Sequence, residues 1–129
     1  MKYTVAFLWT FSLMSTCLSQ SSEEEQKRIE ITSQIAKQFE SGDYELIREK
    51  FDANMRAALS ADQLKEVWEQ LLSQLGEYEE RGVVTTSKIQ QYEVVYMELK
   101  FRLAPFKLKV VFNEAEEVAG LFLIPVTAE

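Results

Sequence analysis

The spacing of apolar residues changes at Gly76, from the period of a helix to the period of a strand. Before this glycine, apolar residues recur three and four positions apart, which is typical of amphipathic helices. After it, in residues 93–103, every second residue is apolar, which is typical of a half-buried strand in an antiparallel sheet. A block of helices followed by a block of strands predicts an α+β domain. The length of 129 residues suits a single domain of this kind.

The helical block is expected to hold three helices. One face of the first helix is apolar and consists of Ile31, Ile35 and Phe39. Gly42 ends this helix, because glycine readily adopts the left-handed conformation that often follows a helix. A second, shorter helix is expected over residues 44–51. Beyond a break near Asp52, Met55 and Leu59 continue its apolar face.

The third helix has the clearest boundaries. Ser60 and Gln63 form the capping box that marks the start of a helix, and Gly76 marks its end. Its apolar stripe consists of Leu64, Val67, Trp68, Leu71, Leu72 and Leu75. We expect this stripe to pack on the sheet, because an amphipathic face must be buried against another element.

The strand block begins to alternate clearly at residue 93. Pro105 separates the run over 93–103 from a second alternating run over 106–112. After a polar loop, residues 118–126 form the last strand, in which Gly120 is expected to mark a bulge or a bend.

The stretch over residues 77–91 is expected to contribute one strand around Tyr78 and another around Val83. Together with the later runs, it predicts four to five antiparallel strands. The expected architecture is therefore three N-terminal helices packed on one face of this sheet.

Residues 1–19 have the layout of a secretory signal peptide. Lys2 supplies an early positive charge, an apolar run covers residues 3–14, and small or polar residues follow. The run is shorter than the roughly 20 apolar residues that a membrane span needs. A buried element of the fold is the alternative, but the next stretch is abruptly polar. We expect export to the periplasm or the medium, a polar lead-in over 20–28, and a mature domain over 29–129 without a transmembrane helix.

Cys17 lies where a bacterial lipoprotein carries its acylated cysteine. The preceding residues Met14, Ser15 and Thr16 resemble the lipoprotein motif only loosely. The motif prefers a branched aliphatic residue in place of Met14, and Gly, Ala or Ser in place of Thr16. Cleavage near Ser19 would remove Cys17. Soluble export is the main expectation, and lipid anchoring through Cys17 is the alternative.

The composition excludes several kinds of chemistry. The chain has no histidine, which excludes histidine-based triads, histidine zinc ligands and imidazole proton shuttles. Its single cysteine excludes an intramolecular disulfide. With 14 basic and 21 acidic residues, the net charge is −7, so we expect no nucleic-acid partner. The acidic residues lack the spacing of a calcium loop, and we expect no metal or other cofactor.

Several short motifs resemble a bacterial family of exported domains. They are Gly42-Asp43-Tyr44, Phe51-Asp52, Trp68 before Gly76, Val110-Val111-Phe112-Asn113, Gly120-Leu121-Phe122 and Pro125. The family is catalogued as a domain of unknown function (number 3887), and the resemblance extends from Ile29 to Val126. It implies a cone-shaped fold like that of nuclear transport factor two, in which three helices pack across a curved antiparallel sheet. It brings no catalytic residues to this sequence.

The resemblance leads us to expect a non-catalytic module for binding or self-association. Cone-shaped domains often have a cavity between helices and sheet, an argument that rests on analogy of fold. An apolar-ligand pocket lined by Phe51, Met55, Trp68 and Tyr96 is one interpretation, and ordinary core packing of these residues is the other. The expected partners are a second copy of the chain, another exported protein, or a small apolar ligand.

An isomerase-type enzyme is the remaining alternative. Tyr92, Tyr96 and Glu98 share one strand face by even spacing, and a carboxylate base with a tyrosine donor can act without histidine. A glutamate facing water is a poorly poised base, so we expect no catalysis. The same face includes Val94, and the final strand is apolar on both faces, which favours association.

Overall fold

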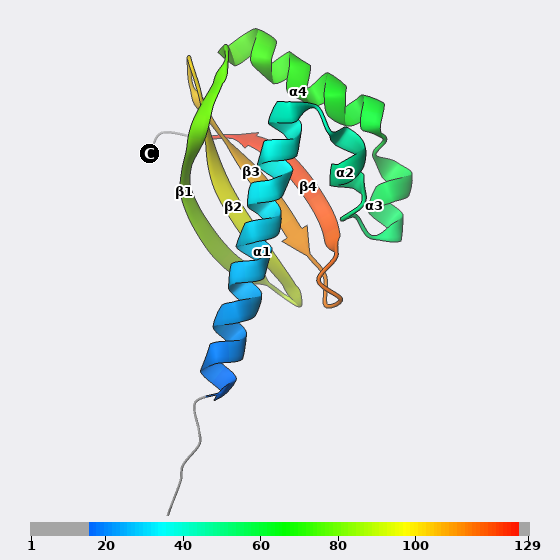
Figure 1. Ribbon diagram of the computed structural model, residues 1–129, viewed down its shortest axis with the longest axis vertical. Helices are drawn as coiled ribbons and strands as arrows, with labels where there is room; N and C mark the ends of the chain where they lie inside the picture. The colour runs from blue at the N-terminus through cyan, green and yellow to red at the C-terminus, as the bar shows by residue number, and fades with distance from the viewer. Residues whose placement is uncertain (1–15, 127–129) are drawn as a thin grey trace, which may run out of the picture.

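The structure is a computed structural model that describes residues 16–126, with side chains described from Glu23 onward. Its elements are α1 (Thr16–Ser41), α2 (Tyr44–Arg48), α3 (Ala53–Ala58), α4 (Ala61–Leu75), β1 (Tyr78–Ile89), β2 (Tyr92–Phe101), β3 (Pro105–Phe112) and β4 (Val118–Pro125). In the described residues, all the helices precede all the strands (Figure 1). The α+β class is therefore confirmed.

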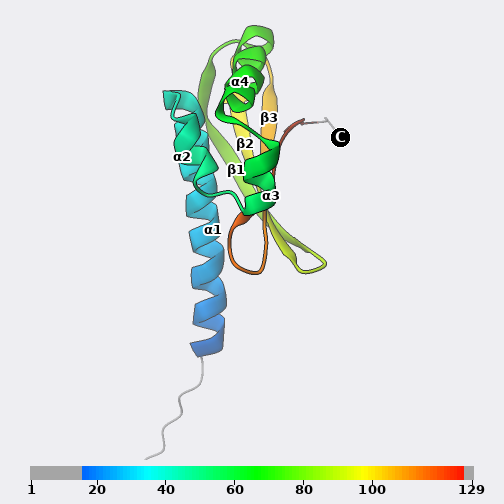
Figure 2. The ribbon, with the colours of Figure 1, turned by 90° about the vertical axis from the view of Figure 1, so that its right-hand side faces the viewer.

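The strands form one antiparallel sheet in the order β1-β2-β3-β4, so each strand pairs with its neighbour in the chain. The strands are curved, and α1 lies across the sheet and packs against β2 and β3 (Figure 1). Helix α3 packs against β4 and flanks its outer side (Figure 2). This meander leaves β1 and β4 as the two edge strands.

The described residues contain four helices, so the expectation of three was wrong. The second expected helix divides at Asp52, whose carboxylate accepts a hydrogen bond from the N–H of Met55 at 2.8 Å and caps α3. The residue before it, Phe51, leaves the helical conformation to form a parallel bridge with Val118. A long-range contact therefore separates α2 from α3 at the break that the sequence suggested.

The stretch after Gly76 forms one strand, not the two expected around Tyr78 and Val83. Register shifts in its pairing with β2 lie between Tyr78 and Glu80 and between Arg81 and Val84. Such bulges bend a strand without ending it, so the sheet has four strands.

The alternating pattern of the sequence extends to Leu103, but β2 ends at Phe101 and Leu103 is 71% exposed. The N–H of Leu103 donates to the carbonyl oxygen of Leu75 at 2.8 Å, and the N–H of Arg102 donates to that of Glu77 at 2.8 Å. These bonds hold the turn after β2 against the end of α4, so the strand stops where the chain turns.

The predicted ends of α4 are confirmed. The N–H of Gln63 donates to the Ser60 hydroxyl at 3.2 Å, and the Gln63 side chain accepts from the N–H of Ser60 at 2.9 Å. Gly76 ends the helix with a φ of 84°. In β4, a register shift at the step from Val118 to Gly120 confirms the bulge expected there.

The core lies between the helices and the sheet. Its buried members include Ile35, Phe39, Ile47, Phe51, Leu64, Trp68, Met97, Leu99, Leu108, Val110 and Phe112. Trp68 is 3% exposed, so the stripe through it packs inward as predicted. Val67, on the margin of the same stripe, is 41% exposed.

Residues 1–15 of the expected signal peptide lie outside the described residues. Its last residues, 16–19, and the expected lead-in, 20–28, belong to α1, so this polar stretch is helical. The guanidinium of Arg28 is held between two carboxylates, with Glu116 at 3.0 Å and Glu93 at 3.8 Å. No helix in the described part of the chain is long and apolar enough to cross a membrane.

Candidate functional site

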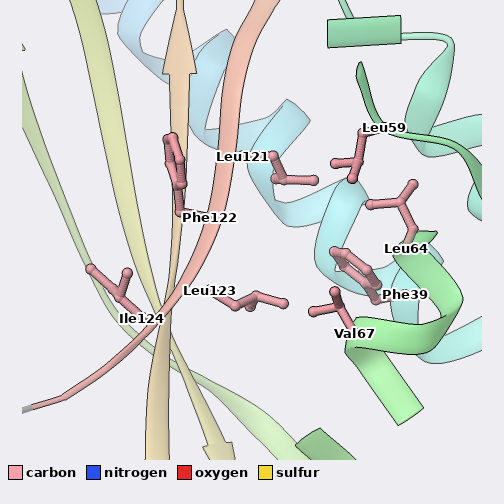
Figure 3. Close-up of a pocket in the computed structure, with 8 residues that line it drawn as sticks. All are labelled: Phe39, Leu59, Leu64, Val67, Leu121, Phe122, Leu123 and Ile124. Atoms are coloured by element: carbon pink, nitrogen blue, oxygen red, sulfur yellow. The ribbon is translucent and has the colours of Figure 1, made fainter. Parts of the chain in front are cut away.

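An apolar cleft of about 310 Å³ opens between α4 and the edge strand β4. It is lined by Phe39, Leu59, Leu64, Val67, Leu121, Phe122, Leu123 and Ile124. None of these eight residues has an ionisable or hydrogen-bonding side chain. Figure 3 shows the side chains from α1 and α4 facing Leu121 and Leu123 across the cleft.

One wall of the cleft is built by local sequence signals. Asp52 caps α3 at one end, and Leu59 ends it in an extended conformation, with a φ of −135° and a ψ of 112°. The capping box at Ser60 then starts α4 directly. Leu64 and Val67 follow on one face of α4, because residues three apart on a helix share a face.

The other wall is the open edge of β4. Leu121 and Leu123 point toward the helices, whereas Phe122 and Ile124 point to the opposite side of the strand (Figure 3). Consecutive strand residues face opposite sides of a sheet, so a cleft bordered by four in a row lies at the margin of the strand. The cleft therefore presents the main chain of β4 as well as its side chains.

Of the four residues expected to line a ligand pocket, three lie on the helix side of the sheet and Tyr96 does not. Phe51 and Trp68 are buried in the core, and Met55 is half-buried at its margin. Tyr96 lies on the opposite face of the sheet, where the Lys107 ammonium is 5.6 Å from its ring centroid. The grouping fails because the neighbour of Tyr96, Met97, is the one that faces the helices.

The residues that line the cleft belong to apolar patterns of the sequence, but those patterns predict packing and not a binding site. Val67 counted as part of the stripe of α4, and Leu121–Ile124 counted as a run that is apolar on both faces. A strand that is apolar on both faces is the signal that could have identified the cleft, because its second apolar face must also be buried against something.

The constellation considered for catalysis lies on the outer face of the sheet. Tyr92, Tyr96 and Glu98 follow each other at even positions of β2, away from the cleft. The Glu98 carboxylate accepts a hydrogen bond from the N–H of Val83 at 3.4 Å. In the described residues, no three metal-binding side chains of the Cys, Asp or Glu type come together.

Three groups with shifted pKa values lie outside the cleft. Burial raises the pKa of Tyr78 and, with help from Glu69, that of Tyr44. Burial lowers the pKa of Lys50, against the opposing charge of Glu49. The Lys50 ammonium donates to the Gln38 side chain at 3.1 Å. The lining of the cleft itself contains no titratable side chain.

A second depression, between α1 and β1, has a mixed polar lining. Its residues are Ser33, Lys37, Glu40, Tyr78, Glu79, Glu80 and Arg81. The Arg81 guanidinium contacts the Ser33 hydroxyl across it. Its lining contains charges of both signs, and the apolar cleft is the better candidate site.

A family model described as "Protein of unknown function (DUF3887)" matches residues 32–121. The matched region contains the C-terminal part of α1, the other helices, the first three strands and the start of β4. No curated protein and no solved structure matches the chain.

Proposed function

The chain belongs to the DUF3887 family of proteins of unknown function, and from that premise we propose that it is an exported, non-catalytic module that binds an apolar group in the cleft beside β4. The observation that carries the proposal is the lining of the cleft, which consists of eight apolar residues at an open sheet edge. Its volume of about 310 Å³ lies at the lower end of the roughly 300–1,000 Å³ of small-molecule sites.

The hydrophobic effect supplies the driving force for such binding. Apolar surface that leaves water contributes about 25 cal/mol per Å². The walls come from α1, the α3–α4 segment and β4, and Phe39 and Leu64 in them are anchored in the core. The site therefore needs little rearrangement, which lowers the cost of binding.

Export is part of the same proposal and is supported by the leader. The apolar run over 3–14 follows a single lysine and precedes small polar residues. Cleavage near Ser19 would remove the first residues of α1 but leave the contacts of Glu25 with Thr86 and of Arg28 with Glu116 in place. The removal of residues 1–19 is therefore compatible with an intact domain.

The cone-shaped fold like that of nuclear transport factor two stays a proposal as well. It is supported by the curved antiparallel sheet and by the helices that precede it (Figure 1). Association through the outer face of the sheet has less support, because Val94, which was expected to offer apolar surface there, is already buried.

The experiment is a titration of the full chain with N-phenyl-1-naphthylamine, a neutral dye whose emission rises in apolar sites. Val67→Glu places a carboxylate at the cleft. Val67 is 41% exposed, so the fold should tolerate the charge. We expect this variant to bind the dye at least about tenfold more weakly, because a desolvated carboxylate is strongly unfavourable.

Val83→Glu is the matched control, since Val83 is 68% exposed on the other edge strand. It should bind the dye like the unmodified chain. The leader is present in all three proteins, so dye bound to it adds equally to each. Equal binding by Val67→Glu and Val83→Glu, or no saturable binding by folded protein, would overturn the proposal.

A further inference from the structure

The two edges of the sheet differ in their protection against an added strand. Strand β1 carries Glu79, Glu80, Arg81 and Lys88 and has two register shifts, which are common defences of an exposed edge. Strand β4 runs Val-Ala-Gly-Leu-Phe-Leu-Ile-Pro and carries no charge. The unprotected edge is also the one that borders the apolar cleft.

One end of the β4 edge already pairs with an extended stretch of the same chain. The N–H of Val118 donates to the carbonyl oxygen of Lys50 at 2.9 Å, and the N–H of Asp52 donates to that of Val118 at 2.9 Å. The chain then turns away into α3. Within the described residues, no other backbone hydrogen bond reaches the outer edge of β4.

The register identifies the main-chain groups that remain open. The main-chain N–H and C=O of Val118 both point outward, away from β3. Phe112, which lies opposite Val118, therefore directs its own main-chain groups to β2. Val110 and Leu108 do the same, because alternate residues of a strand bond to the same neighbouring strand. Their β4 partners, Leu121 and Leu123, therefore direct their N–H and C=O groups to the open edge. Pro125 has the same parity and lacks an N–H, as expected of an outward position in an edge strand.

We propose that the open edge of β4 binds an extended polypeptide segment as a fifth strand, with alternate apolar side chains entering the cleft and acidic side chains between them. The proposal rests on the proposed function and names the ligand class of the same cleft. Main-chain bonds to Leu121 and Leu123 would supply affinity, and the cleft would select the apolar side chains.

The acidic half of this pattern follows from the charge beside the edge. On the outer face, Lys107 and Lys109 follow each other on β3, and β3 and β4 contain no acidic residue. Lys107 lies opposite Glu98 of β2 in the register, so Lys109, nearer to β4 residue Phe122, contributes most of the uncompensated charge at this edge. The Lys109 ammonium is 5.5 Å from the ring centroid of Phe122. Neither lysine forms an ion pair within the described part of the chain. Acidic side chains on the outer face of an added strand would neutralise this local positive charge.

A peptide fits this edge better than a second copy of the domain. Helix α3 flanks the outer side of β4, and α4 forms the far wall of the cleft (Figures 1 and 2). If two copies paired antiparallel through β4, the helices of both copies would lie on the same side of the joined sheet and would clash with one another. A single strand requires only the width of the cleft.

The test uses the full chain and a synthetic eight-residue peptide in which leucine and glutamate alternate. Two further peptides are N-methylated, one at every leucine and the other at every glutamate. In a bound strand, either the leucine N–H groups or the glutamate N–H groups point toward β4. Methylation of that set should weaken binding by at least about tenfold, whereas methylation of the other set should leave binding within about threefold. Equal effects of the two methylations would overturn the strand model.

The charge is tested with Lys109→Glu and with a peptide in which lysine replaces glutamate. We expect Lys109→Glu to weaken the glutamate peptide by about threefold or more and to strengthen the lysine peptide. Lys27→Glu, an exposed change on α1, makes the same change in net charge and should alter neither. Equal effects of both variants would overturn the acidic pattern.

The outcomes separate this inference from the proposed function. Dye binding that Val67→Glu abolishes, together with no binding of any peptide, would reject the strand and keep the apolar site. No binding of either probe would reject both. Sedimentation that shows a dimer, which excess peptide does not dissociate, would assign the edge to a second copy and overturn the inference.

Discussion

The phenyl ring of Phe39 stacks on the indole ring of Trp68, with ring centroids 5.0 Å apart and an interplanar angle of 20°. Phe39 forms part of the cleft, whereas Trp68 lies in the core and also contacts the rings of Tyr78 and Phe101. The floor of the cleft is thus continuous with the aromatic core. A guest in the cleft would meet a wall whose position is fixed by the packing of the whole domain.

Phe39→Ala should lower the free energy of unfolding by about 3–5 kcal/mol, because it leaves a cavity beneath Trp68. Urea unfolding followed by circular dichroism measures this loss. Phe122→Ala is the control, since Phe122 is 49% exposed, and it should cost about 1 kcal/mol. Similar losses for both variants would show that the floor of the cleft is not part of the core.

Gly76→Ala should lower the free energy of unfolding by about 1–3 kcal/mol, because only glycine readily adopts its conformation. Its φ is 84° and its ψ is −167°, and an added Cβ would lie 3.0 Å from the Cβ of Arg102. Gly42→Ala provides the comparison, since Gly42 has a φ of 83° but nothing within 4 Å of an added Cβ. Thermal unfolding should show the larger loss at Gly76, and an equal loss at Gly42 would contradict the close approach to Arg102.

Local signals could be read from the sequence, and long-range ones could not. Ser60 and Gln63 are three residues apart and determine the start of α4 by themselves. The separation of α2 from α3, by contrast, depends on the bridge between Phe51 and Val118, which only the closed fold brings together. The continuity of β1 likewise depends on bulges that its pairing with β2 permits.

The candidate site was missed for a related reason. The cleft joins residues of α1, the α3–α4 segment and β4, and no spacing within one segment reveals that combination. The inclusion of Tyr96 in a pocket with Trp68 conflicted with the alternation of β2, which places Tyr96 on the face of Glu98. The sequence shows that β4 is apolar on both faces, but it does not show which elements lie against those faces.

Tyr78→Phe should make stability less sensitive to alkaline pH. Burial raises the pKa of Tyr78 above 10.0, as Glu40 and Glu80 also do, while Arg81 opposes them. Folding therefore favours the neutral phenol, a contribution that is present below pH 10.0 and is lost as the pH rises through the folded-state pKa.

The measurement is the free energy of unfolding near pH 8 and near pH 11 for both proteins. Lys50 acts in the opposite direction, because its lowered pKa makes stability rise as the pH approaches 10.5. It is present in both proteins, so the comparison cancels it. An equal loss of unfolding free energy between the two pH values in the unmodified chain and in Tyr78→Phe would contradict this role of Tyr78.

The exported protein should lack residues 1–19. Mass spectrometry of the chain recovered from a bacterial host should show cleavage near Ser19 and no lipid. Cys17→Ser should then be processed like the unmodified chain. An acylated N-terminus at Cys17, or processing that Cys17→Ser abolishes, would establish lipid anchoring instead, and an exported chain that keeps Met1 would reject the signal peptide.

An apolar binding site between α4 and β4 should be visible in ¹H–¹⁵N spectra of the full chain during titration with N-phenyl-1-naphthylamine. We expect saturable shifts of the amide signals of Val67, Leu121 and Leu123, whereas the signals of Val83 and Ile89 on the other edge should stay unchanged. Shifts confined to other residues, or spread evenly over the sheet, would contradict it.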